Sequence, residues 1–79
     1  MECCSDPKVE LIEELGHVEG VDWDLGRCKS CGSSVLHQWS VHRPTLIFND
    51  KLTAEEYERF HRSRDDERRS LLKAWYADQ

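Results

Sequence analysis

The sequence of 79 residues predicts a small α+β domain, in which a three-stranded antiparallel sheet packs with one N-terminal helix and one or two C-terminal helices. Apolar and polar side chains alternate over residues 23–28 and 33–41, the period of a strand with one buried face. The last third carries a capping box and apolar stripes at helical spacing. We expect a single domain over residues 1–79, with residues 1–5 as a flexible tail.

The N-terminal helix is expected over residues 7–15. Asp6 suits the N-cap, Pro7 suits the first turn, and Gly16 suits the position just past the end. Its apolar face would consist of Leu11, Ile12 and Leu15. The acidic side chains would lie mostly on the opposite face of this helix.

The two alternating segments are expected to form a hairpin, and residues 45–48 a third strand. Arg43-Pro44 would end the second strand, because proline cannot donate to a β-ladder. Asn49-Asp50 would close the third strand as a turn. Thr53 then starts a helix, and the acidic residues 65–67 offer a second start, so one bent helix and two short helices both fit.

Charge is distributed unevenly along the chain. The net charge is −5, but residues 1–26 hold eight acidic residues and one lysine, which gives −7. This end would repel a phosphate backbone and attract a basic protein surface. The chain shows no apolar run that would span a bilayer and no secretory signal pattern, which favours the cytoplasm and no membrane partner. In a reducing compartment, four cysteines indicate metal ligands or thiols instead of disulfides.

The strongest motif is Cys28-Lys29-Ser30-Cys31-Gly32 in the predicted hairpin turn. Two thiolates at this spacing can face one tetrahedral metal ion. The following glycine permits a positive φ, which turns backbone amides toward sulfur. Over residues 27–33 the chain resembles the knuckle of zinc-ribbon and rubredoxin-type proteins. Zinc ribbons of that group imply a second knuckle, and this chain has no second Cys-x-x-Cys.

A structural zinc site takes four ligands, so the knuckle needs partners from elsewhere. His37 lies six residues beyond the knuckle, roughly 20 Å along an extended strand, and is too far away. A helix over residues 7–15 would separate the first cysteines from His17 by about 13 Å, so these two groups compete. We expect a structural Zn²⁺ held by Cys28, Cys31 and one of Cys3 or Cys4, with His17 as the next choice.

The leading interpretation of function is a metal-stabilised protein-binding module of the inhibitor or immunity type, which recognises a basic partner protein. Small acidic proteins that neutralise basic effectors use negative surfaces in this way. The residues expected to contact the partner are Glu10, Glu13, Glu14, Glu19, Asp22 and Asp24.

Two alternatives stay open. A nucleic-acid-binding knuckle would act through Arg27, Lys29, Arg43 and the C-terminal arginines, but those arginines are interleaved with acids at i,i+4 spacing, which disfavours it. A redox dithiol of Cys28 and Cys31 would sit in a hairpin instead of at a helix start. The sequence carries no phosphate loop and no nucleophile elbow, so we do not expect an enzyme.

Overall fold

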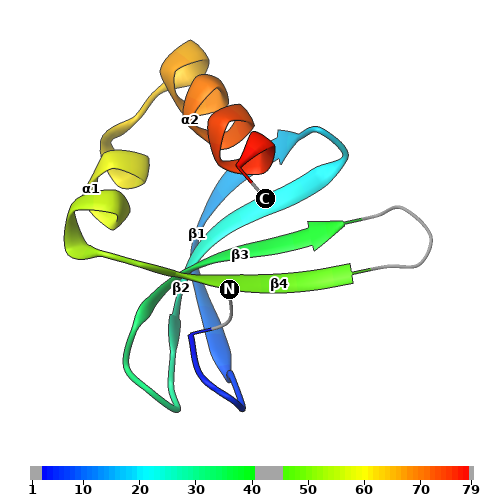
Figure 1. Cartoon of the computed structure of the whole chain (residues 1–79). Helices are drawn as coiled ribbons and strands as arrows, with labels where there is room; N and C mark the ends of the chain where they lie inside the picture. Colours follow the sequence, from blue (N-terminus) through cyan, green and yellow to red (C-terminus); the bar gives the residue numbers. More distant parts are fainter. Residues whose placement is uncertain (1–2, 41–45, 79) are drawn as a thin grey trace.

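The computed structural model describes residues 3–40 and 46–78. It contains one antiparallel sheet followed by two helices: β1 (Val9–Val18), β2 (Val21–Cys28), β3 (Ser34–Ser40), β4 (Leu46–Leu52), α1 (Ala54–Arg62) and α2 (Asp65–Ala77). The strand order β1-β2-β3-β4 is a meander, because each strand pairs with the next one in the chain. Both helices lie over one end of the sheet, and the β2–β3 turn and the N-terminal segment lie at the other end (Figure 1).

The expected three-stranded sheet with an N-terminal helix is wrong. Residues 9–15 belong to the ten-residue strand β1, which pairs with β2. The register shifts between Leu11 and Glu13 and again between Glu14 and Gly16, and each bulge interrupts the two-residue alternation that marks a strand. Leu11 and Ile12 are 53% and 52% exposed, so only Leu15 of the three apolar residues that suggested a helix lies in the core.

The third strand is longer than expected. β4 continues through Asn49 and Asp50, which were expected to form a turn, and ends at Leu52. Asp50 is buried and accepts hydrogen bonds from Gln38 Nε2 at 2.7 Å and from Trp75 Nε1 at 2.8 Å. These bonds let a carboxylate occupy the interior of the fold. The expected strand end at Arg43-Pro44 lies outside the described residues.

The core lies between one face of the sheet and the two helices. It is formed by Leu15, Val21, Trp23, Leu25, Leu36, Leu52, Phe60 and Leu72. The Trp23 side chain is fully buried, and its Nε1 donates to the Val18 carbonyl at 2.9 Å. Phe60 meets Trp75 edge to face, with ring centroids 5.8 Å apart. Burial of a large apolar side chain of this kind contributes about 1.5–3 kcal/mol.

The last third of the chain forms two helices. The capping box is confirmed, because Thr53 Oγ1 accepts from the Glu56 amide at 3.1 Å and the Thr53 amide donates to Glu56 Oε1 at 2.8 Å. The buried Ser63 caps the C-terminal end of α1, and its amide donates to the Arg59 carbonyl. Neither helix, within the part of the chain that the structure describes, is long and apolar enough to cross a membrane.

A carboxylate on β1 links the sheet to both helices. Glu13 Oε1 lies 2.6 Å from His61 Nδ1 of α1, and Glu13 Oε2 lies 3.3 Å from Arg68 Nη2 of α2. Farther along α2, Trp75 reaches Asp50 on β4. α2 therefore crosses the sheet from its first strand to its last.

Candidate metal centre

The pairing of β1 with β2 brings the N-terminal cysteines to the knuckle. Val9, the first residue of β1, is paired with Cys28, the last residue of β2. The Lys29 amide donates to the Lys8 carbonyl at 2.8 Å and extends this contact into the turn. At Gly26, a Cβ would lie 2.8 Å from both Glu10 O and Val9 Cγ1, so the two strands approach closely here. The residues that precede β1 therefore lie beside the end of β2.

The β2–β3 turn holds the second pair of sulfurs. The Cys28 amide donates to the Ser33 carbonyl at 2.9 Å, and the Gly32 amide donates to the Cys28 carbonyl at 2.8 Å. Gly32 has a φ of +77°, which glycine adopts without strain. The loop is thus closed by its own backbone, with Cys28 at its start and Cys31 near its tip.

Four sulfur atoms converge at this end of the sheet. The Sγ atoms of Cys3, Cys4, Cys28 and Cys31 all lie within 4.8 Å of one another. Cys4 Sγ lies 3.9 Å from Cys3 Sγ and 3.7 Å from Cys28 Sγ. A tetrahedral ion with metal–sulfur bonds of about 2.3 Å places its ligands about 3.8 Å apart. The four cysteines are therefore spaced so that they can hold one metal ion.

The sulfur cluster is separate from the main core. Cys28 is buried but does not belong to the core cluster, and strand alternation places it on the opposite face of β2 from Trp23 and Leu25. Cys3 and Cys4 are half-buried, while Cys31 is exposed. The site is closed on the side of the sheet and open to solvent at the tip of the turn.

The four thiols differ in acidity. A hydrogen bond from the Lys8 backbone, supported by the backbones of Cys31 and Ser30, lowers the pKa of Cys28 to about 6 against the opposing effect of burial. Hydrogen bonds from the side chain and backbone of Ser33 lower the pKa of Cys31.

The pKa values of Cys3 and Cys4 shift in the opposite direction. Burial, followed by hydrogen bonding to Cys28, raises the pKa of Cys3, and burial raises the pKa of Cys4. At neutral pH the knuckle thus supplies a thiolate, and the N-terminal pair must lose protons before it can bind a metal.

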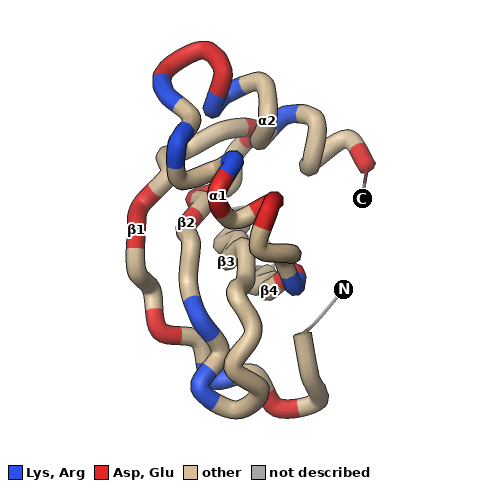
Figure 2. The backbone as a smooth tube through the Cα atoms, turned by 90° about the vertical axis from the view of Figure 1, so that its left-hand side faces the viewer, with Lys and Arg blue, Asp and Glu red and all other residues tan. Residues whose placement is uncertain are grey.

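Basic residues flank the cysteines in sequence. Lys8, Arg27 and Lys29 belong to the segments that carry the cysteines, and blue segments mark the lower end of the tube in Figure 2. Four thiolates around a divalent ion carry a formal charge of −2, and cationic side chains in these segments would favour that charge. Lys29 Nζ lies 3.4 Å from Glu10 Oε2, so this lysine ties the turn to β1.

His17, the next-choice ligand, is not near the sulfurs. It is paired with Asp22 at the other end of the β1–β2 hairpin, and its Nδ1 lies 2.7 Å from Asp22 Oδ1. The extended conformation of β1 separates His17 from the N-terminal cysteines even further than the expected helix would have done. His37 lies 2.7 Å from Asn49 Oδ1 on β4.

The acidic residues expected to contact a partner all lie on β1, β2 and the turn between them, and separate red segments mark acids along β1 in Figure 2. Glu10, Glu13 and Asp22 each have a basic or histidine partner within the chain. Glu14 and Glu19 are exposed, and no ion pair involves them among the described residues. These two carboxylates are the ones best placed to face another molecule.

Asp24 is half-buried on β2, between acidic neighbours. Burial raises its pKa most, His37 acts in the opposite direction, and Glu14 and Asp22 raise it further. Glu14 is its direct partner across the strands. Like charges at directly opposed positions destabilise a sheet.

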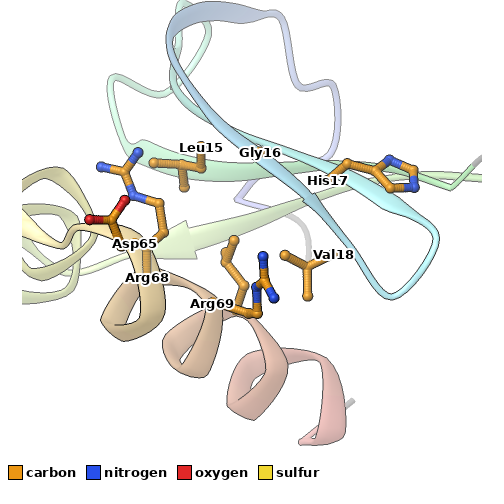
Figure 3. A pocket seen from close by; sticks show the side chains of 8 residues that line it. Leu15, Gly16, His17, Val18, Asp65, Arg68 and Arg69 are labelled. Atoms are coloured by element: carbon orange, nitrogen blue, oxygen red, sulfur yellow. The ribbon is translucent and has the colours of Figure 1, made fainter.

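A shallow pocket of about 250 Å³ lies between the end of β1 and the start of α2 (Figure 3). It is lined by Leu15, Gly16, His17, Val18, Asp65, Arg68, Arg69 and Leu72. Arg68 already binds Glu13, Ser63 and the Phe60 carbonyl, so it serves the fold. The pocket holds none of the cysteines, and we assign it no function.

Comparison of the chain with protein-family models, with curated proteins and with solved structures gives no match. The function is therefore inferred from the geometry of the site. All four cysteines were candidates from the sequence, but only one of Cys3 and Cys4 was expected to join the knuckle. The role of Glu13 in joining sheet and helices was not anticipated, because the sequence offers no local signal for it.

Proposed function

We propose that this chain is a zinc-stabilised protein-binding module in which Cys3, Cys4, Cys28 and Cys31 hold one structural Zn²⁺. The observation that supports the metal site is the convergence of four sulfurs within 4.8 Å. Thiolates are soft ligands that favour zinc or iron over magnesium or calcium. Four protein ligands fill a tetrahedral shell and leave no position for a substrate, which is the arrangement of structural zinc sites.

The ion would join two parts of the chain that the sheet already brings close. Cys4 and Cys28 are 24 positions apart in sequence, and a metal bridge between them restricts the unfolded chain as a crosslink does. A domain of this size builds only a small core, so such a crosslink contributes a large share of its stability. The site belongs to the scaffold, and the function lies on the surface that the scaffold presents.

The proposed partner is a protein with a basic surface, as for a small inhibitor or immunity protein. Glu14 and Glu19 are exposed and are not paired within the described residues, and they lie on an acidic part of the chain. Such a surface accelerates association with a basic partner and makes binding sensitive to salt. The closed metal shell supports binding over catalysis.

Metal analysis of the full chain, purified with reductant and without chelator, tests the metal site. We expect one zinc per chain, and we expect Cys4→Ser and Cys28→Ser to lose the metal and to melt at a lower temperature. Ser30→Ala is the matched control, since Ser30 is an exposed residue of the same turn, and it should retain the zinc. Cobalt substitution should give the intense visible absorption of tetrahedral thiolate coordination.

The zinc site would be refuted if the chain purified without chelator contained no zinc and melted at the same temperature as Cys28→Ser. Reactive thiols in that metal-free protein would favour the redox alternative, because the pKa of Cys28 is lowered to about 6.

Charge reversal tests the proposed binding surface. Crosslinking in native lysate should recover a basic protein with the wild-type chain at low salt and much less of it with Glu14→Lys/Glu19→Lys. Glu55→Lys is the control, because Glu55 is an exposed acid on α1, outside the segment that carries Glu14 and Glu19. Retention of a salt-sensitive oligonucleotide instead of a protein would contradict the proposal and favour the nucleic-acid alternative.

A further inference from the structure

Among residues 3–40 and 46–78, the sheet has two outer strands, β1 and β4. An outer strand presents backbone N–H and C=O groups that have no partner strand on one side, and these groups can template pairing with another chain. Proteins suppress such pairing with bulges, charged side chains or a covering segment. The two edges of this sheet differ sharply in these protections.

β1 carries two of these protections. Its register with β2 shifts twice, so its backbone does not present a regular ladder. It also carries Glu10, Glu13 and Glu14, which would place a row of carboxylates against any strand that paired with it.

β4 carries neither protection in its first half. It pairs with β3 without a register shift from Leu46 to Leu52, and residues 46–49 contain no charged side chain. Leu46, Ile47 and Phe48 are 46%, 58% and 43% exposed. Three consecutive apolar residues are thus exposed on a regular strand at the edge of the sheet.

The apolar side chains lie on both faces of this edge. Ile47 pairs directly with Trp39 of β3, which is 46% exposed, so these two side chains share one face. Leu46 and Phe48 alternate with Ile47 and lie on the face of Asp50, the side of α2. A strand added alongside β4 would therefore cover apolar surface above and below the sheet.

We propose that β4 pairs antiparallel with β4 of a second copy of this chain across a two-fold axis. The product is one continuous eight-stranded sheet with a β1 strand at each outer edge. Such an isologous contact closes on itself, because each copy uses its β4 edge for the other, and the bulges and carboxylates of β1 oppose growth from the two remaining edges. If β4 paired with β1 of another copy, the sheet would extend from copy to copy without closing. The bulges of β1 oppose this pairing.

Charge and area agree with a second copy as the occupant. When two β4 strands pair across a two-fold axis, residues 46–49 of one copy face residues 46–49 of the other. These residues carry no charge, so no like charges meet and the patch is complementary to itself. Trp39, Leu46, Ile47 and Phe48 are each exposed by 43–58%, and together they would bury roughly 400 Å² of largely apolar surface, counted over both faces of the edge. This is about half of what one partner buries in a standard interface, and the backbone edge of β4 supplies further contacts.

Sedimentation equilibrium of the full, metal-loaded chain tests the proposal between about 1 and about 200 μM, the range that reveals a micromolar dimer. We expect twice the 9.3 kDa mass of one chain at the upper end. Ile47→Lys should raise the dissociation constant at least about thirtyfold, because it buries a charge at the centre of the contact. Its circular dichroism and zinc content should not change, because Ile47 is already exposed in the single chain.

Leu11→Lys on β1 is the matched control, since Leu11 is 53% exposed and Ile47 is 58% exposed. It should leave the dimer intact. A single-chain mass at the highest concentration would overturn the proposal, as would an Ile47→Lys variant as dimeric as the wild type. Loss of the dimer in Leu11→Lys alone would overturn it as well, by placing the contact at β1.

Hydrogen exchange on the wild-type chain provides a test without a variant. Backbone amides within residues 46–49 should gain protection as the concentration rises through the dissociation constant, and the amides of β1 should not. The same low protection at every concentration would contradict a paired β4.

Discussion

Arg68 joins the two helices to the sheet, and its replacement tests how strongly they are held. Its Nη2 donates to Glu13 Oε2 at 3.3 Å and to the Phe60 carbonyl at 3.1 Å, and its Nε donates to Ser63 Oγ at 3.1 Å. The side chain is only 17% exposed. One planar guanidinium thus binds β1, the end of α1 and the turn that precedes α2.

The cost of Arg68→Ala can be worked out from these contacts. A hydrogen bond to a charged group contributes about 1.5–3 kcal/mol, but bonds that share one guanidinium are not additive. The partly exposed ion pair with Glu13 adds roughly 0.2–1 kcal/mol. We therefore expect a loss of about 2–3 kcal/mol, which corresponds to a melting temperature about 10–20 °C lower in a domain of this size.

Arg68→Lys separates charge from geometry. A lysine keeps the positive charge near Glu13, but a single ammonium cannot reproduce the fork that reaches all three acceptors. It should recover about half of the loss. Arg69→Ala is the control, because Arg69 is exposed and forms no ion pair among the described residues, and it should stay within about 0.5 kcal/mol of the wild type.

Thermal and urea unfolding of the metal-loaded chains, followed by circular dichroism at constant free zinc, measure these differences. An Arg68→Ala variant no less stable than Arg69→Ala would refute the reasoning. Arg68→Lys as stable as the wild type would show that charge alone holds the helices.

Three further predictions concern the metal site and the first two strands. Zinc binding near neutral pH should release about two to three protons, because the raised pKa values of Cys3 and Cys4 keep both protonated while Cys28, with a pKa of about 6, has already lost its proton. Affinity should rise with pH, and calorimetry in buffers of different ionisation enthalpy counts the protons. Gly26→Ala should cost about 2 kcal/mol in urea unfolding, since its methyl group would overlap β1, and a loss below about 0.5 kcal/mol would contradict this. The pKa of Asp24 is raised above 3.8 in the folded chain, so the folded state favours the protonated carboxyl. The contribution of Asp24 to stability therefore falls as the pH rises from 3.8 through the pKa of the folded state. Asp24→Asn should therefore stabilise the chain by roughly 0.5 kcal/mol at neutral pH and by less in acid, and equal stability at neutral pH would refute this.

The helical part of the fold was predictable because its signals are local. Thr53 and Glu56 cap each other within one turn, and the structure has that cap. The sequence could not decide between one helix and two. The break occurs at Ser63, whose hydroxyl donates to the Phe60 carbonyl and accepts from Arg68, and these partners become visible only in three dimensions.

The first strand was not predictable from local pattern. Its two register shifts remove the alternation of a strand, and its run of Glu and Leu imitates a helix. Pairing with β2 decides its conformation, and such pairing joins residues far apart in sequence. Local propensity yields to tertiary context in cases of this kind.

Only the local half of the candidate metal site was predictable from the sequence. The spacing of Cys28 and Cys31 within one turn identifies half of the site. The positions of Cys3 and Cys4 follow from β1, because an extended strand that starts opposite Cys28 brings the preceding residues to the knuckle. The helix expected there made the N-terminal cysteines and His17 compete for the site and gave no reason to bring both cysteines to the knuckle.

The meander also has a consequence for the order in which the protein assembles. Every strand pairs with its neighbour in sequence, so contact order in the sheet is low and each hairpin can close without a long chain segment having to find its place. The proposed metal bridge between residues 4 and 28 needs the first hairpin beforehand, so we expect it to form late in folding, after the transition state. Chelation should then accelerate unfolding severalfold while it leaves the folding rate nearly unchanged.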